Sequence, residues 1–194
     1  MKKLLLILTL FFNSCSVGQN LTSYTVYAGK SFPKPSLTGS VGNTLEAYVY
    51  IDYTWNQVYL STDNSTHKII GVSDLLGKNS LRLGVRRSPN QADGLVAVNY
   101  YHKNGKFYYP ALKDSLGKPL ILKYETGYYI RINKENNIWK MELYEDSMEN
   151  KLLSSATDSI SISSFGRRLQ GPYIEVGSSP SPWTIITKIK INKK

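Results

Sequence analysis

Hydrophobic and polar residues alternate along much of the chain, and this period of two predicts β-strands rather than helices. In the segment 45–52 the odd positions are apolar and the even positions are polar or aromatic. The segment 81–86 repeats the pattern, with Arg82 and Arg86 among its polar positions. Successive side chains of a strand point to opposite faces, so each segment offers one face to a hydrophobic core.

A hairpin is predicted over 95–109, because Asn104-Gly105 suits the two-residue type I′ turn that joins antiparallel strands. This turn sets the register and places Tyr101 opposite Tyr108. We expect these two tyrosines on the outer face of the hairpin. The opposite face carries a row of apolar and aromatic residues.

A second hairpin is expected to join 128–133 to 138–144, followed by a third strand at 151–156. Pairing Ile132 with Trp139 puts the large apolar residues of both strands on one face, and a one-residue slip would expose them. The three strands would form a meander.

Further strands are expected at 172–176 and 184–191, and 63–67 is interpreted as a polar turn. Helix is scarce, with one or two turns expected at 72–76 behind Ser73 as N-cap. Many short strands without a strand–helix–strand rhythm predict an all-β fold. The expected architecture is an antiparallel two-sheet β-sandwich of the jelly-roll type.

The N-terminal residues 1–15 indicate an export signal, because two lysines precede an apolar stretch at 4–12. That stretch is shorter than the roughly 20 residues that span a membrane. Cleavage before Cys15 would make a lipoprotein with the lipid on that cysteine, although Phe12 stands where such motifs usually have leucine.

Cleavage after residues 16–18 is the alternative, which would remove the signal peptide 1–18 and leave 19–194 as a single sandwich domain. Either way we expect an exported protein: an outer-membrane-anchored lipoprotein, a periplasmic protein or a secreted one. Beyond Cys15 the chain has no cysteine, so no disulfide is expected.

The chain is basic, with a formal net charge of +10, and it has 15 tyrosines. A basic surface suits acidic polysaccharide, acidic lipid or nucleic acid, and export disfavours nucleic acid. Tyrosines offer flat faces on which sugars stack, but they also favour strands. Lysines also protect strand edges from pairing, which is the simpler explanation of the charge.

Catalytic signatures are missing from the sequence. Glu142 and Glu145 would fall on opposite faces of their strand, whereas a retaining glycosidase needs two carboxylates about 5 Å apart on one side. Two histidines and no cysteine in the mature chain do not make a standard zinc site. We therefore predict no catalytic residue, no metal and no cofactor, and the sequence favours a protein that is not an enzyme.

The segment 128–156 resembles the meander of concanavalin A-like jelly rolls. The segments 171–177 and 179–185, with a tyrosine-containing strand and a proline-rich corner, are similar to the closing part of exported jelly-roll proteins of Bacteroidota. The resemblance implies two sheets stacked about 10 Å apart. In lectins and glycanases of this architecture one open sheet face meets the sugar, although the fold alone does not transfer function.

Together these features favour a non-catalytic carbohydrate-binding or cell-surface module for an acidic polysaccharide. One alternative is a structural or assembly component of the bacterial envelope, with envelope proteins as partners. The other is a polysaccharide lyase or glycoside hydrolase with unrecognised motifs. The expected ligand-binding residues are outward tyrosines and arginines: Tyr48, Tyr50, Tyr59, Arg82, Arg86, Tyr101, Tyr108 and Arg131.

Overall fold

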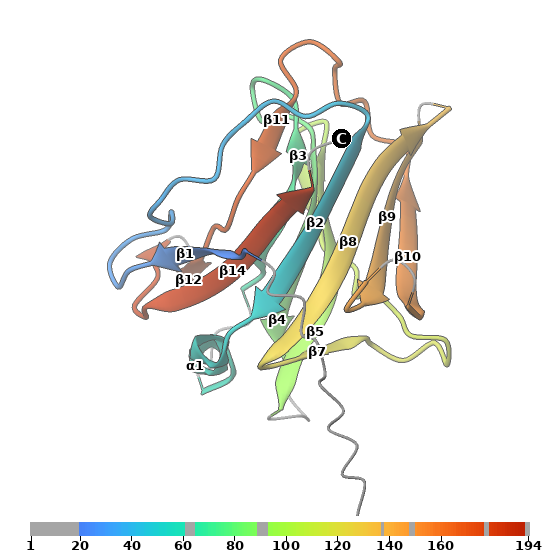
Figure 1. Ribbon diagram of the computed structural model, residues 1–194. Coiled ribbons are helices and arrows are strands. Elements are labelled where there is room, and N and C mark those ends of the chain that lie inside the picture. Colours follow the sequence, from blue (N-terminus) through green and yellow to red (C-terminus); the bar gives the residue numbers. More distant parts are fainter. Residues whose placement is uncertain are drawn as a thin grey trace, which may run out of the picture.

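The computed structural model describes residues 20–60, 65–88, 93–136, 138–147, 150–176 and 179–192. Two antiparallel sheets face each other and enclose the core (Figure 1). The predicted all-β, two-sheet sandwich is therefore confirmed. The expected signal peptide and Cys15 lie outside the described residues. No helix in the described ranges has the length and apolar character needed to cross a membrane.

The first sheet, called sheet I, has six strands in the order β1-β14-β2-β8-β9-β10. Their bounds are β1 Thr22–Val26, β14 Ile185–Asn192, β2 Thr44–Ile51, β8 Thr126–Glu135, β9 Ile138–Glu145 and β10 Leu152–Asp158. The three strands β8, β9 and β10 form the predicted meander.

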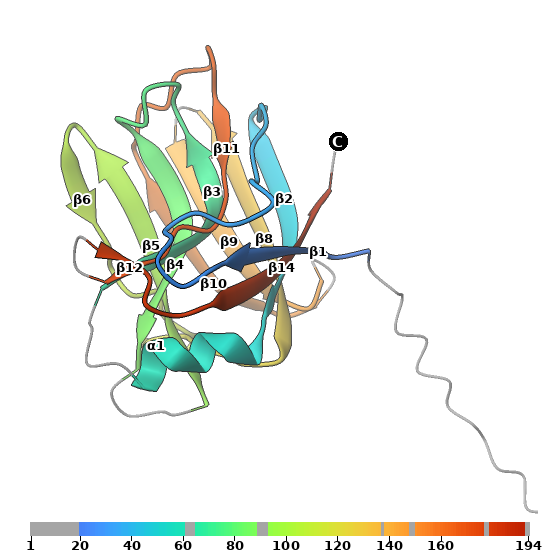
Figure 2. The ribbon, with the colours of Figure 1, turned by 90° about the vertical axis from the view of Figure 1, so that its left-hand side faces the viewer.

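The second sheet, sheet II, has the order β11-β3-β4-β5-β6, with β7 also paired to β5. The bounds are β11 Arg168–Gln170, β3 His67–Ser73, β4 Ser80–Arg87, β5 Gly94–Lys103, β6 Lys106–Tyr108 and β7 Ile121–Lys123. A small pair, β12 Glu175–Val176 and β13 Ser179–Pro180, lies beside them. The short helices η1 Tyr53–Trp55 and α1 Asn56–Leu60 lie at one end of the sandwich (Figure 2).

Alternating positions of the two sheets fill the core, as the sequence pattern predicts. On β2 the apolar side chains of the odd positions belong to the central cluster, while Glu46 on the other face is also buried. Trp55 and Trp139 are both fully buried there. Burying a side chain of this size contributes roughly 2–3 kcal/mol, so these two residues are major contributors to stability.

The first predicted hairpin is confirmed, with Tyr101 paired to Tyr108 and the turn residues Asn104 and Gly105 both at positive φ. The register predicted for the second hairpin is wrong by two residues, because Ile132 pairs with Met141 rather than with Trp139. A tight turn after Glu135 sets this register. The shift by two keeps every side chain on its predicted face.

Two local predictions are wrong. The segment 72–76 forms no helix, because Asp74 instead accepts hydrogen bonds from the backbone N–H groups of Lys78 and Asn79 and closes a loop. His67 does not lie in a polar turn but begins β3, where it is fully buried near Trp55. The helical turns come at 53–60, where the alternation had ended.

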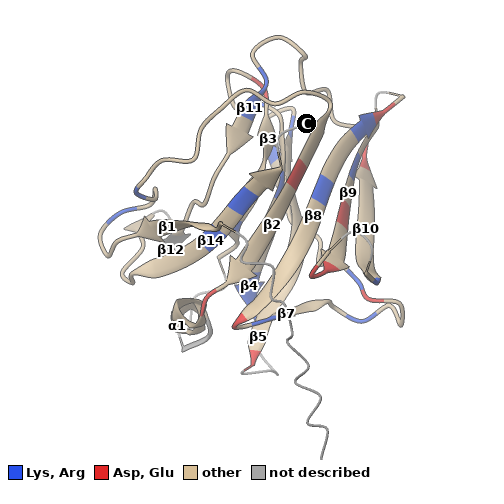
Figure 3. Ribbon diagram, in the orientation of Figure 1, with Lys and Arg blue, Asp and Glu red and all other residues tan. Residues whose placement is uncertain are grey.

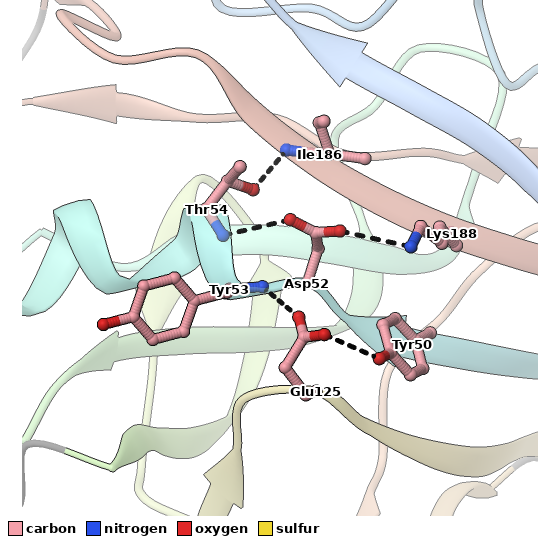
Figure 4. A network of polar contacts seen from close by, with 7 residues as sticks. All are labelled: Tyr50, Asp52, Tyr53, Thr54, Glu125, Ile186 and Lys188. Atoms are coloured by element: carbon pink, nitrogen blue, oxygen red, sulfur yellow. Dashed lines mark hydrogen bonds and ion pairs between the residues drawn. The ribbon is translucent and has the colours of Figure 1, made fainter.

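A polar network fastens these helical turns to sheet I (Figure 4). Asp52 is the N-cap of η1: its carboxylate accepts from Thr54 N at 3.0 Å and pairs with Lys188 Nζ at 3.2 Å. Glu125, beside it, accepts from Tyr53 N at 2.6 Å and from the Tyr50 hydroxyl at 3.0 Å. The helix start is thus tied to β2, to β14 and to the residue that precedes β8.

This network predicts a pH-dependent contribution to stability. Burial raises the pKa of Asp52, but hydrogen bonds from Thr54 and the charge of Lys188 outweigh burial, so the pKa lies below its ordinary value. A carboxyl group whose pKa is lowered by folding stabilises the fold at pH values above its unfolded pKa of about 3.9. That stabilisation is lost as the pH falls through the folded pKa.

Asp52→Ala is therefore expected to lower the free energy of unfolding at neutral pH by about 1 kcal/mol. Denaturant unfolding between neutral pH and pH values below the folded pKa measures this. The difference from the natural protein should shrink as the pH falls. Asp52→Asn is the matched control, because it keeps the cap and loses only the ion pair. A difference that is constant with pH would contradict the assignment.

Candidate functional site

The outer face of sheet II carries a cluster of cations and aromatic rings. Arg82 and Arg86 share this face of β4, as the alternation predicts, and Arg82 pairs directly with Tyr100 on β5. Lys68 on β3 lies on the same face, opposite Gly84. Tyr173 reaches it from the segment that bridges to Lys68. We call Lys68, Arg82, Tyr100 and Tyr173 the cation–tyrosine site.

Lys68 lies between two tyrosines. Its Nζ is 4.9 Å from the ring centroid of Tyr100 and also 4.9 Å from that of Tyr173. An ammonium group at this distance from an aromatic ring is attracted to the ring face, by roughly 0.5–2 kcal/mol depending on its hydration. The lysine therefore holds both rings in fixed positions around itself.

Arg82 is the unusual member of the site. Burial lowers the pKa of its guanidinium, whereas the neighbouring Tyr100 and Tyr173 raise it. Its Nε is buried without a hydrogen-bond partner, and no ion pair to a carboxylate is found for Arg82 among the described residues. Arg82 is partly buried, and arginines withdrawn from water are normally paired with an acidic group. The missing counter-charge makes Arg82 suited to an anionic ligand.

Two glycines make room for these long side chains. Gly71 pairs with Arg82 across β3 and β4, and a Cβ there would lie 2.5 Å from Arg82 Cα and 2.7 Å from Arg82 Cγ. A Cβ added at Gly84 would lie 3.3 Å from Tyr100 Cβ. A side chain at Gly71 would displace Arg82, and one at Gly84 would crowd Thr66 Cγ2, His67 O and Tyr100 Cβ.

A groove of about 550 Å³ leads to this site, between the segments 32–40 and 166–173, with Arg82 and Tyr173 in its lining. Its volume lies within the range of ligand pockets. Phe32, which is 68% exposed, packs edge-on against Tyr173 at 4.9 Å. The groove therefore combines exposed aromatic surface with the guanidinium of Arg82.

Two further arginines belong to the groove but differ in role. Arg167 is buried, donates to Gly42 O and Asn43 Oδ1, and lies 4.8 Å over the ring of Trp139. Its contacts are structural and hold the β1–β2 connection. Arg168 is exposed at the groove, where it adds positive charge.

Three of the predicted residues, Tyr48, Tyr50 and Arg131, lie on the outer face of sheet I and have partners within the protein. The Tyr48 hydroxyl donates to Asp146 at 3.0 Å, and that of Tyr50 donates to Glu125. Arg131 pairs with Glu46 at 3.7 Å. Basic and acidic residues alternate across this sheet, so its charges are balanced locally (Figure 3).

Hydroxyls that donate to carboxylates lose protons reluctantly. Burial and the hydrogen bond to Asp146 raise the pKa of Tyr48 to about 12. Burial and the neighbouring Glu125 also raise the pKa of Tyr50. These two tyrosines therefore remain neutral donors that order the sheet face.

The candidate residues do not share one surface, and the expected outward placement of Tyr101 and Tyr108 is wrong. Tyr101 and Tyr108 do not point outward: they lie on the inner face of sheet II, where Tyr101 packs against the core. The opposite face, with Tyr100 and His102, is the one turned away from sheet I. The side chain of Tyr59, on α1, lies outside the described part of the chain, as does Cys15. Of the candidates whose side chains the structure describes, Arg82 and Arg86 lie on the outer face of sheet II together with Lys68.

Sequence reasoning missed Lys68, Tyr100 and Tyr173 as site residues. Lys68 follows a segment interpreted as a turn, although it is part of β3. The hairpin register already places Tyr100 on the face opposite Tyr101. The sequence does not show that β4 pairs with β5, and this pairing brings Tyr100 beside Arg82. No group of metal-ligating side chains occurs in the described ranges.

A scan against protein-family models and a search of curated proteins found no match to this chain. Solved structures do resemble it. An alginate lyase from Klebsiella pneumoniae superposes with a TM-score of 0.55 at 14% identity, covering 77% of this chain and 58% of the lyase. This chain thus corresponds to little more than half of that protein.

The alginate lyase Aly36B matches with a TM-score of 0.52 at 11% identity, over 90% of this chain and 81% of the lyase. It was solved as a mutant in which a lysine and a tyrosine are replaced by alanine, in complex with an alginate tetrasaccharide. A functionally unknown protein from Saccharomyces cerevisiae matches with a TM-score of 0.52 at 14% identity, over 91% and 92% of the two chains. The chain therefore has the β-sandwich fold of these proteins.

Proposed function

We propose that this protein binds an acidic polysaccharide at the cation–tyrosine site and along the adjoining groove. The observation that carries the proposal is the partly buried guanidinium of Arg82, whose Nε is buried without a hydrogen-bond partner and which has no counter-charge among the described residues. A uronate carboxylate would supply that charge through two parallel hydrogen bonds, the geometry that arginine favours. Lys68 would add a second cation beside it.

Aromatic residues would recognise the sugar rings themselves. Tyr173 and Phe32 line the groove, and sugars stack on such flat, partly polar surfaces. The sandwich shared with two alginate lyases supports a carbohydrate-related role without fixing the ligand. The outer face of sheet I, with paired charges, is the less suitable surface.

Affinity electrophoresis tests this function directly. The protein should be retarded in gels containing alginate or polygalacturonate, less so as the salt concentration rises, and not in gels containing a neutral glucan. Salt weakens binding because the attraction between exposed charges is screened. Equal migration in all gels would contradict the proposal and would favour a structural role in the envelope.

A second candidate function, polysaccharide elimination, is favoured by the position of Tyr173 beside Lys68 in the groove. Arg82 would neutralise the uronate carboxylate. The Tyr173 phenolate would take the proton from the carbon next to that carboxylate. The electron pair forms a double bond to the neighbouring carbon, and the bond to the glycosidic oxygen breaks. That oxygen takes the proton back from Tyr173.

Ultraviolet absorbance of the unsaturated product distinguishes this candidate from simple binding. If elimination occurs, Tyr173→Phe should remove at least 99% of the turnover while polymer retention persists, because the ring stays and only the hydroxyl is lost (about a hundredfold or more for a catalytic base). Retention by the natural protein without any rise in absorbance would leave binding as the function and exclude elimination on the polymers tested.

A further inference from the structure

A second cavity of about 300 Å³ opens on the other side of sheet II, between β5, the segment 110–113 and β10. Its lining includes Asn99 and Tyr101, which alternate along β5 with the residues of the outer face. The cavity is therefore separated from the cation–tyrosine site by the thickness of the sheet. An inference about it does not depend on the proposed function.

Two oxygen acceptors face this cavity. Asn99, which is 3% exposed, donates from Nδ2 to Asp158 Oδ2 at 2.5 Å. The other atom of its amide, Oδ1, is buried without a hydrogen-bond partner in the described residues. An unsatisfied buried acceptor costs about 1–3 kcal/mol, so a ligand that brings a donor would recover that energy.

A rigid aromatic wall stands beside the acceptors. Tyr101 lines the cavity and stacks on Tyr108, with ring centroids 4.8 Å apart and planes at 13°. The stack fixes the orientation of Tyr101. An aromatic face next to carboxylate and amide oxygens matches a pyranose ring, which has an apolar face and a rim of hydroxyl donors.

The charges around the cavity favour a neutral ligand. Asp158 would repel an anion, whereas Lys113 in the lining and Lys103, whose Nζ donates to Ser159 Oγ at 3.1 Å, would repel a cation. A hydroxyl group meets neither repulsion. This separates the cavity from the cation–tyrosine site, which attracts anions.

The ionised side chain of Asp158 also lowers the stability of the fold. Burial raises the pKa of its carboxyl, although Asn99 and Lys103 lower it. A raised carboxyl pKa means that the ionised form destabilises the fold, and the loss is complete once the pH exceeds the folded pKa. A residue kept at a cost in stability is more common at functional sites than in scaffolds.

We propose that this cavity binds the hydroxyl groups of a neutral sugar residue. Asp158 and Asn99 Oδ1 would accept from adjacent hydroxyls, and Tyr101 would pack against the ring. The volume suits one or two sugar rings rather than a long chain segment.

Nuclear magnetic resonance titration of the full chain with neutral cello-, manno- and galacto-oligosaccharides tests this site. At least one series should shift the side-chain amide of Asn99 and the backbone amides around Tyr101 saturably. Asp158→Asn should weaken that binding about tenfold or more, because one strong acceptor is lost (a charge-assisted hydrogen bond). The variant should be as thermally stable as the natural protein or more so.

Asp146→Asn is the matched control, since it is the same change just after β9, where the carboxylate accepts from the Tyr48 hydroxyl, and it should leave sugar binding unchanged. If no neutral oligosaccharide moves the Asn99 amide and Asp158→Asn lowers the melting temperature, Asp158 merely straps the two sheets together and the proposal is overturned. Binding of alginate by the cation–tyrosine site is measured separately, so either proposal can fail alone.

Discussion

Replacing Arg82 with methionine is expected to abolish most of the binding of acidic polysaccharide while the fold remains intact. Methionine keeps the apolar stem of the side chain and removes the guanidinium. Loss of charge-assisted hydrogen bonds to a carboxylate costs about 1.5–3 kcal/mol, which corresponds to a tenfold to hundredfold weaker affinity. Isothermal titration with oligouronates measures this directly.

The stability of the same variant separates a binding role from a structural one. Burying a cation without a partner is unfavourable, so Arg82→Met should unfold at the same denaturant concentration as the natural protein or a higher one. Arg131→Met, on the opposite sheet and paired with Glu46, is the control and should keep its affinity. Equal losses of affinity in both variants would indicate a diffuse charge effect instead of a site.

Gly71→Ala is expected to destabilise the protein by about 3 kcal/mol or more, the largest effect on stability that we predict. The added Cβ would collide with the backbone carbonyl of Leu81 and lie 2.5 Å from Arg82 Cα. Backbone atoms in the middle of a sheet have little room to move. Thermal or denaturant unfolding provides the measurement.

Gly39→Ala is the matched control, because a Cβ at Gly39 meets nothing within 4 Å and no positive φ is involved. It should change the free energy of unfolding by less than about 0.5 kcal/mol. If Gly71→Ala unfolds like the control, then β3 and β4 are not packed as described around Arg82. The described geometry of the cation–tyrosine site would then be wrong.

Much of the fold follows from local sequence rules. The alternation in β2 and β14 fixes which side chains enter the core, and Asn104-Gly105 fixes the register of β5 and β6. These features depend on neighbouring residues only. The second hairpin shows the limit, because moving its pairing by two residues leaves every side chain on the same face and the hydrophobic pattern cannot choose between the two registers.

The site was less predictable because it depends on distant pairings. Arg82 meets Tyr173 only because the segment after β11 runs beside β3, some 100 residues away in sequence. When both faces of a strand carry aromatic residues, the alternation of hydrophobic and polar positions does not show which face is turned toward the core. Tyr100 and Tyr101 are such neighbours, and the structure turns Tyr101 toward the core.

Chemical-shift mapping with a defined oligouronate is the most direct test of the central claim that sheet II carries the polysaccharide site. The account predicts saturable shifts of the Arg82 side-chain Nε–H signal and of the amides of Lys68, Tyr100 and Tyr173. Shifts confined to Tyr48, Tyr50 and Arg131 on the outer face of sheet I, or no shifts at all, would contradict it.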